Sequence, residues 1–124
     1  MTDAIGARDI ETALSILEKL VVMREPVTRI RFMLARHLRQ LLCAKDVDTA
    51  STLASKLKIS PYIGQKLIRQ AKLFKMEELL NLFLLCAQSD FDIKTGKIDE
   101  KMALDMLICM ADKRINKNAK PLFT

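Results

Sequence analysis

The most constraining stretch of the chain is the run LLNLFLLCA at residues 79–87, in which only Asn81 is polar. In a helix, which turns by about 100° per residue, the apolar side chains of this run point to nearly every side. A helix without a polar side has to be covered by its own domain or by a partner. The run is shorter than the roughly 20 residues that a membrane span needs. We therefore expect it to form the central helix of a helical bundle, which can serve the core alone or also contact a partner.

The composition favours helices throughout. The chain has 124 residues, of which only three are glycine and three are proline. Half of all residues are hydrophobic, and 5% are aromatic. Strands prefer aromatic and β-branched residues, whereas a mixture dominated by Leu, Ile, Met, Ala, Lys and Glu is typical of helices. A chain of this length can bury a core without disulfides or metals. We predict an all-α fold, a single compact bundle of about six to seven helices.

The net charge and the cysteines exclude few kinds of function. The formal net charge of +6 permits contact with nucleic acid or an acidic protein surface and requires neither. Cys43, Cys86 and Cys109 have no CxxC spacing, so they predict neither a zinc site nor a redox motif. Free thiols, no signal-peptide pattern and no span long enough for a membrane are typical of a cytoplasmic protein.

Helical periodicity predicts three helices in the first part of the chain. A single turn at residues 2–6 precedes a helix at 10–23, for which Asp9 is a good N-cap. Glu25-Pro26 ends that helix and starts the next, at 27–44, because proline disfavours helical geometry before it and suits a first turn. The expected core residues of the third helix are Val27, Ile30, Met33, Leu34, His37, Leu38 and Leu41.

His37 is the only histidine of the chain and lies within that core face. No carboxylate or thiol stands at helical spacing to join it in a metal site. A buried structural histidine is therefore the expected role, and a metal ligand or catalytic base is the alternative.

The opposite side of the 27–44 helix combines arginines with apolar groups. Arg29, Arg36 and Arg39 lie there with Phe32 and Cys43. Arginine and aromatic residues are enriched at protein interfaces, whereas lysine is not. This side is either an interface or a second packing face flanked by solvated arginines, and the sequence leaves both open.

Residues 49–74 have the outline of a helix-turn-helix. A short helix at 49–57 leads to Ser60, a good N-cap, and Pro61, a good first residue for a helix that runs to about residue 74. The residues expected to face inward from this second helix are Ile63, Leu67, Ile68 and Ala71.

The same second helix carries Lys66, Arg69 and Lys72, which could contact phosphates and bases in a DNA major groove. However, Lys58 stands at the turn, where many DNA-binding examples have glycine, and Gly64 stands where an apolar residue would anchor the helix. The shape is also common in domains that never bind DNA. A nucleic-acid-binding module is therefore the alternative function.

The last part of the chain predicts two helices and a tail. The central helix is expected at 76–93, with Gly96 just beyond its end, and Asp99 caps a helix at 100–113. We assign residues 1–113 to the helical domain and residues 114–124 to a basic C-terminal tail.

No arrangement typical of an enzyme is present in the sequence. Asp90 and Asp92 are two residues apart on a helix, so they face different directions. There is no Gly-rich phosphate loop, HExxH motif, nucleophile elbow or Cys–His pairing. We expect a non-catalytic domain without metal or cofactor.

The chain resembles a known family around its central helix. The segments that carry the resemblance are, in order, SPY at 60–62, KLIRQA at 66–71, Phe74, EELL at 77–80, DFDIKTG at 90–96 and Ala103-Leu104. The TDAI start at 2–5 and Glu25-Pro26 are similar to the beginning of the same domain. Together they resemble the C-terminal domain of the bacterial DNA polymerase III delta subunit, a clamp-loader component.

The resemblance implies an all-helical collar domain from a longer subunit. In the family, such collars hold the delta subunit, the ATPase subunits and the delta-prime subunit together in the ring that loads the sliding clamp onto DNA. The clamp-binding residues of the family lie in domains that precede the collar. For this chain, the resemblance implies a role in assembly, with the sliding clamp and DNA reached only indirectly and no cofactor or membrane involved.

With a collar role, we expect two groups of subunit contacts. They are Arg29, Phe32, Arg36 and Arg39 on one helix, and Leu82 and Leu85 on the central helix. Gly64 departs from the family, which more often has a branched or charged residue there. A glycine within a helix costs about 1 kcal/mol relative to alanine, so the packing at this position stays open.

Overall fold

The computed structural model describes residues 1–47 and 49–112, and within these ranges the chain forms seven α-helices and no strand. They are α1 (Thr2–Gly6), α2 (Ile10–Val22), α3 (Val27–Lys45), α4 (Ala50–Leu57), α5 (Pro61–Ala71), α6 (Met76–Lys94) and α7 (Glu100–Met110). The prediction of an all-α bundle is confirmed. The expected tail at 114–124 lies outside the described residues, and α7 ends three residues before the predicted residue 113.

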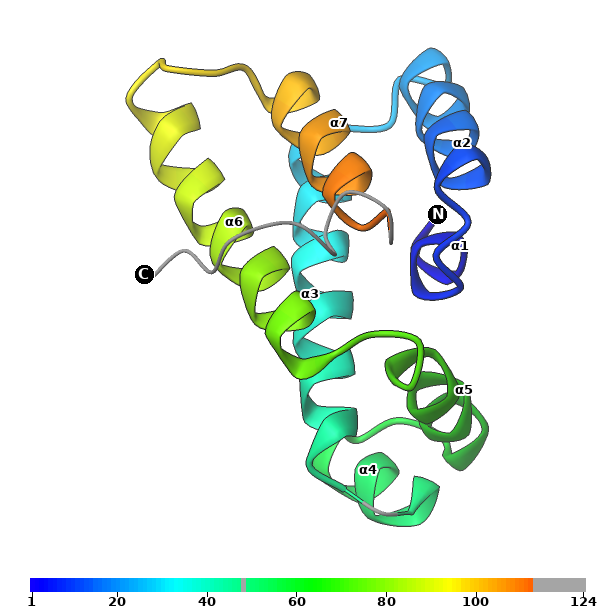
Figure 1. Ribbon diagram of the computed structural model, residues 1–124. Coiled ribbons are helices and arrows are strands. Elements are labelled where there is room, and N and C mark those ends of the chain that lie inside the picture. Colours follow the sequence, from blue (N-terminus) through cyan, green and yellow to red (C-terminus); the bar gives the residue numbers. More distant parts are fainter. Residues whose placement is uncertain (48, 113–124) are drawn as a thin grey trace.

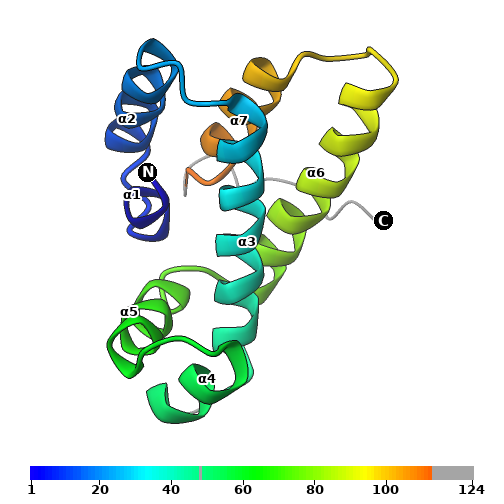
Figure 2. The ribbon, with the colours of Figure 1, turned by 180° about the vertical axis from the view of Figure 1, so that it is seen from behind.

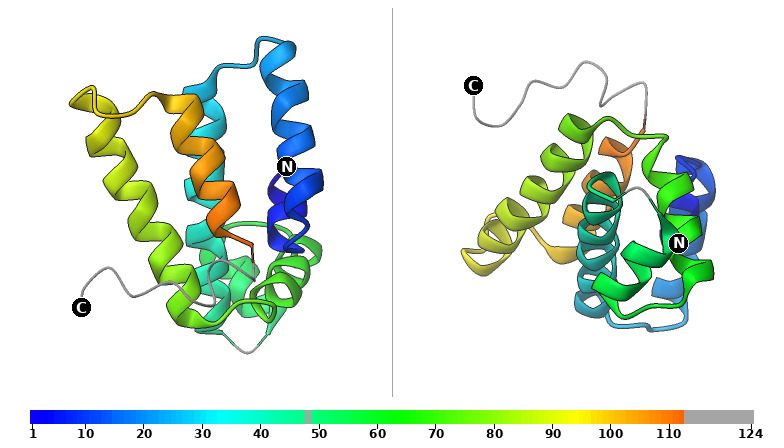
Figure 3. Two further views of the ribbon diagram at one scale, coloured as in Figure 1. Left: turned by 45° about the horizontal axis from the view of Figure 1, so that its top comes forward. Right: turned by 90° about the horizontal axis from the view of Figure 1, so that it is seen from below.

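The third helix, α3, is the axis of the bundle, with α1, α4, α5, α6 and α7 packed against it (Figure 1). Its inner face carries Ile30, Leu34, Leu38 and Leu41, each no more than 2% exposed. Helix α6 lies on one side of α3, and α1 and α2 lie on the other, as the view from behind also shows (Figure 2). Helix α7 packs against α3 between them and contacts both α6 and α2. The α4–α5 pair closes the end of the bundle opposite the α2–α3 and α6–α7 connections (Figure 3).

Polar side chains fix the helix ends at the positions that the sequence predicted. The side chains of Asp9, Ser60 and Asp99 each accept a hydrogen bond from the backbone N–H three residues later, at 3.3, 3.3 and 2.9 Å. Thr49 caps α4 in the same way, so this helix begins one residue later than expected. Gly96, at φ +77°, supplies the left-handed residue that follows α6.

Two residues expected in the core lie at the surface instead. Met33 is 45% exposed, because the inner face of α3 is narrower than the sequence suggested. Ile63 is also exposed, because α5 turns Gly64 rather than Ile63 toward the core. Phe74, predicted as the end of α5, follows that helix in the α5–α6 connection and is buried.

Gly64 allows α4 and α5 to approach closely. A Cβ atom built at Gly64 would lie only 2.9 Å from the carbonyl oxygen of Ala50, the first residue of α4. Since that oxygen belongs to the backbone, it cannot move away cheaply. The glycine is therefore explained by helix packing, which offsets its cost of about 1 kcal/mol in helix propensity.

Arg8 ties the α1–α2 connection to two distant parts of the chain. Its side chain is almost fully buried and donates to the carbonyl oxygens of Ala111 at 3.2 Å and Leu73 at 2.9 Å. It also pairs with Glu78 at 2.7 Å, and its guanidinium lies 4.3 Å from the centre of the Phe74 ring. One side chain thus joins the start of the chain to the α5–α6 connection and to the end of α7.

We expect Gly64→Ala to destabilise the protein by about 1–3 kcal/mol, although alanine is the better helix former, because the added methyl group would clash with α4. Urea-induced unfolding measures the change. Ser55→Ala, at an exposed position of α4, is the control and should change the free energy of unfolding by less than about 0.5 kcal/mol. A Gly64→Ala variant as stable as the unmodified protein would contradict the close α4–α5 contact.

Candidate subunit interface

One face of α3 turns away from the core and combines basic with apolar side chains. Phe32 is 59% exposed, and Arg29, Arg36 and Arg39 are exposed beside it. We call these four residues together with Met33 the α3 outer face. The structure places all four residues that the sequence singled out on this helix at the surface, whereas Cys43 is half-buried.

A hollow of about 430 Å³ lies at the N-terminal half of this face. It is lined by Pro26, Thr28, Arg29, Phe32, Met33 and Arg36. Met33 and Pro26 were missed as surface residues, since the first was assigned to the core and the second was considered only as a helix start. The spacing of Met33, four residues after Arg29 and three before Arg36, is the signal that could have found it.

The α3 outer face carries a surplus of positive charge. The helix contains four arginines and one lysine but no aspartate or glutamate. Arg29 forms an exposed pair with Glu25 at 3.3 Å, which is worth little in water. In the part of the chain that the structure describes, Arg36 and Arg39 form no ion pair. Their guanidinium groups are therefore available to a partner.

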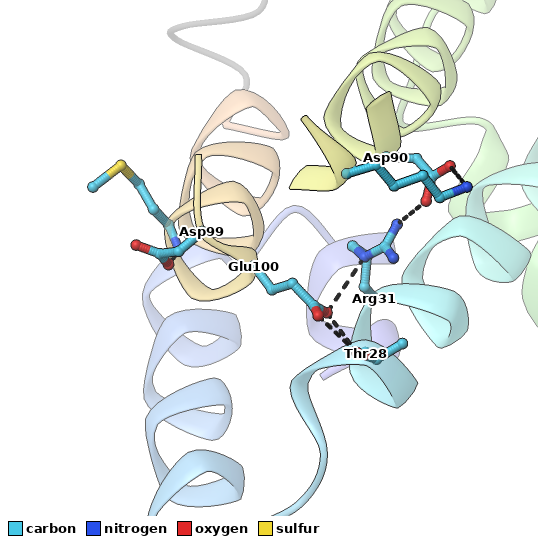
Figure 4. A network of polar contacts seen from close by, with 7 residues as sticks. Thr28, Arg31, Asp90, Asp99 and Glu100 are labelled. Carbon is cyan, nitrogen blue, oxygen red and sulfur yellow. Dashed lines mark hydrogen bonds and ion pairs between the residues drawn. The ribbon is translucent and has the colours of Figure 1, made fainter. Parts of the chain in front are cut away.

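Arg31 lies on the flank of the same helix and joins it to α6 and α7 (Figure 4). It is only 8% exposed, with one nitrogen 3.1 Å from Asp90 and another 3.7 Å from Glu100. Glu100 in turn accepts a hydrogen bond from the Thr28 hydroxyl. The guanidinium also lies 5.1 Å from the centre of the Phe32 ring. The exposed aromatic ring is thus backed by a charge network that spans three helices.

Asp90 is held in its ionised form. Hydrogen bonds from Lys94 and then from Arg31 keep the pKa of the Asp90 carboxyl below its usual range. The Lys94 contact is 2.9 Å long and runs along α6. At neutral pH the carboxylate is therefore available to neutralise the buried Arg31.

The prediction that the helix around residues 79–87 is the central one of the bundle is wrong, because α3 takes that place and α6 packs against α3 and α7. Helix α6 also places its two predicted contact residues differently. Leu82 is 1% exposed and belongs to the core, and Leu85 is half-buried. The outward side of α6 instead shows Met76, Leu80 and Phe91, the last of them 62% exposed. The helix is therefore not covered on all sides in this chain, although the sequence had led us to expect a cover from its own domain or from a partner. Because the run at residues 79–87 is apolar except for Asn81, the sequence could not distinguish its inner from its outer residues.

The residues of the nucleic-acid alternative are partly engaged within the domain. The Nζ atom of Lys66 lies 2.9 Å from Asp3 of α1, and Asp3 also accepts a hydrogen bond from Gln70 at 3.4 Å. The hydrogen bond lowers the pKa of Asp3 and raises the pKa of Lys66. Arg69 and Lys72 are exposed. Helix α1 therefore covers part of the helix that a DNA-binding module would present.

The histidine and the three cysteines are the remaining reactive groups. His37 is buried in the core, as predicted, and burial lowers its pKa to about 4. Cys43, Cys86 and Cys109 are free thiols, and burial raises the pKa of Cys86 to about 11. Within residues 1–47 and 49–112, no three His, Cys, Asp or Glu side chains gather in a way that could hold a metal. None of the helices in these ranges is long and apolar enough to cross a membrane.

The comparison with known families is decisive. The family described as the DNA polymerase III delta subunit, C-terminal domain, matches residues 1–111. This chain belongs to that family. The DNA polymerase III subunit delta of Bacillus subtilis (strain 168) is 29% identical over 110 residues, which make up 86% of this chain and 32% of that protein.

The structural comparison agrees with the family. The solved structure of the Bacillus subtilis DNA clamp loader delta protein matches 91% of this chain and 34% of its own, with a TM-score of 0.78 and 26% identity. The delta-family chain therefore spans about one third of the length of both relatives. The likeness supports the delta-subunit interpretation of the sequence and not the helix-turn-helix alternative.

We expect the free energy of unfolding to fall by about 2 kcal/mol between pH 7 and pH 5 through His37. Its native pKa of about 4 lies below the ordinary value of 6.5, so the unfolded chain takes up the proton first as the pH falls. Urea titrations at the two pH values measure the change. His37→Gln should remove most of it.

Asp3 does not interfere in this pH window, because the hydrogen bond from Lys66 holds the pKa of its carboxyl below the ordinary value of 3.8. A His37→Gln variant that keeps the full loss of stability between pH 7 and pH 5 would assign that loss to another group.

Proposed function

We propose that this chain is the collar domain of a clamp-loader delta subunit, a non-catalytic domain that joins the subunit to its neighbours. Through that assembly it would help to load the sliding clamp onto DNA during replication. Family membership over residues 1–111 supports the identity of the subunit. The proposed location is the bacterial cytoplasm, where replication takes place.

The proposed partners are the ATPase subunits and the delta-prime subunit. The α3 outer face is the first candidate contact, and the outward side of α6 is the second. Leu85 lies at the margin of the second contact, while Leu82 would act only by supporting it from the core. The sliding clamp and DNA would be contacted by other parts of the complete subunit.

The observation that carries this proposal is the exposed Phe32 beside the hollow, together with Arg36 and Arg39, which form no ion pair with the described residues. The sequence left open whether this side of α3 is an interface or a second packing face. In the described ranges, Phe32 stays 59% exposed, so it contributes little to folding. Exposed aromatic, Met and Arg side chains in one patch are typical of the residues that dominate binding at protein interfaces.

Size-exclusion chromatography with light scattering tests the proposal. The chain is mixed with the collar-containing clamp-loader subunits of the same organism. We expect co-elution at a stoichiometric mass. Separate elution at micromolar concentrations would contradict a collar that assembles through its own surfaces.

We further expect the double variant Phe32→Ala, Arg36→Ala to weaken that assembly by about 2 kcal/mol or more, while its thermal midpoint stays nearly unchanged. Both side chains are exposed, so their removal costs the fold little. Calorimetric titration and thermal unfolding measure the two effects.

Lys19→Ala, Val22→Ala is the matched control, because it removes one basic and one apolar side chain from the exposed side of α2. It should leave the affinity unchanged. A large drop in thermal midpoint with unchanged assembly would instead assign Phe32 and Arg36 to the fold.

A further inference from the structure

We infer that the α3 outer face binds an acidic amphipathic helix of a partner protein. That helix would place an apolar side chain in the hollow and carboxylates beside Arg36 and Arg39. The inference rests on the proposed function, because it names the chemistry of the partner at the same surface.

The lining of the hollow favours an apolar side chain as its occupant. Pro26, Phe32 and Met33 supply apolar surface, and Met adapts its shape to what it contacts. Among the polar lining side chains, the Thr28 hydroxyl is already donated to Glu100 at 2.7–2.8 Å. Only the arginines are left to orient a ligand. Small-molecule sites of similar volume fix their ligand with several convergent polar groups, and the lining side chains of this hollow do not supply them.

The ring of Phe32 already has one contact within the chain before any partner arrives. Arg31 lies against its ring, and Asp90 and Glu100 fix Arg31 in turn. A ring whose position is already restricted loses less conformational freedom on binding, so more of its contact energy appears as affinity. The network in Figure 4 thus prepares one wall of the hollow.

The charges determine which kind of helix fits. Two carboxylates beside the face are engaged, Glu25 with Arg29 and Glu100 with Arg31. Arg36 and Arg39 are three residues apart on one side of a helix, so they can receive two carboxylates from one turn of a partner. Arginine is suited to such contacts because its planar group can donate two parallel hydrogen bonds to a carboxylate.

The same surface is less suited to nucleic acid. Proteins that bind single strands line a basic groove with several aromatic rings, on which successive bases stack. The α3 outer face offers the single ring of Phe32, and the guanidinium of Arg31 already lies over it. An apolar hollow also has no counterpart in a phosphate backbone. The observations therefore favour a protein partner.

Charge reversal tests the inference. The affinity of Arg36→Glu and of Arg39→Glu for the collar-containing clamp-loader subunits of the same organism is compared with that of the unmodified chain. Each variant is expected to bind at least tenfold more weakly, and binding of the unmodified chain should weaken as salt is raised. Lys56→Glu reverses an exposed charge on α4 and should have less than a twofold effect.

Two further sets of substitutions separate a loss of binding from a loss of folding and locate the contact on the partner. Arg36→Gln removes the charge without reversing it, so it replaces Arg36→Glu if the thermal midpoint of the latter falls. Glu→Arg or Asp→Arg substitutions on the partner that restore binding to Arg36→Glu would support the inference and identify the acidic helix.

The outcomes separate this inference from the proposed function. If the assembly forms and Arg36→Glu and Arg39→Glu weaken it no more than Lys56→Glu does, the acidic-helix inference is overturned and the collar proposal stands. If the unmodified chain binds no subunit, both fail. If the two variants lose binding to a single-stranded oligonucleotide but keep their subunit affinity, the surface binds nucleic acid and the inference is overturned.

Discussion

The packing of helices from both sides onto one apolar face of α3 is the interaction on which the rest of this structure depends. Ile30, Leu34, Leu38 and Leu41 on that face are almost completely buried. Burying each such side chain contributes about 1.5–3 kcal/mol. This single face serves α1 and α4–α7 together. The opposite face is left exposed to solvent and carries three arginines and an aromatic ring.

Two buried arginines add contacts between the helices that pack on this apolar face. Arg8 joins the start of the chain to the α5–α6 connection and the end of α7, and Arg31 joins α3 to α6 and α7. A buried charge is costly unless it is paired and hydrogen-bonded, and each arginine has a carboxylate partner from a distant segment. These pairs therefore favour one arrangement of the helices over others that would leave the charges unpaired.

Local features of the sequence predicted much of the fold, and long-range contacts account for the rest. Asp9, Ser60 and Asp99 act on backbone groups three residues away, so their caps could be read directly. The need for glycine at position 64 could not be predicted in this way, because it arises from contact with a carbonyl oxygen of another helix. At the candidate interface, the alternation of arginine and core positions on α3 revealed Arg36, but the apolar run at residues 79–87 of α6 did not show which side faces outward. Leu82 was therefore chosen where Phe91 is exposed.

The central claim is that the outer face of α3 is where this delta-family chain meets other clamp-loader subunits. Hydrogen–deuterium exchange of the chain, alone and mixed with those subunits, tests it most directly. The account predicts slower amide exchange over residues 27–45 in the mixture, with α2 and α4 unchanged. Slower exchange confined to α5, with α3 unaffected, would contradict it.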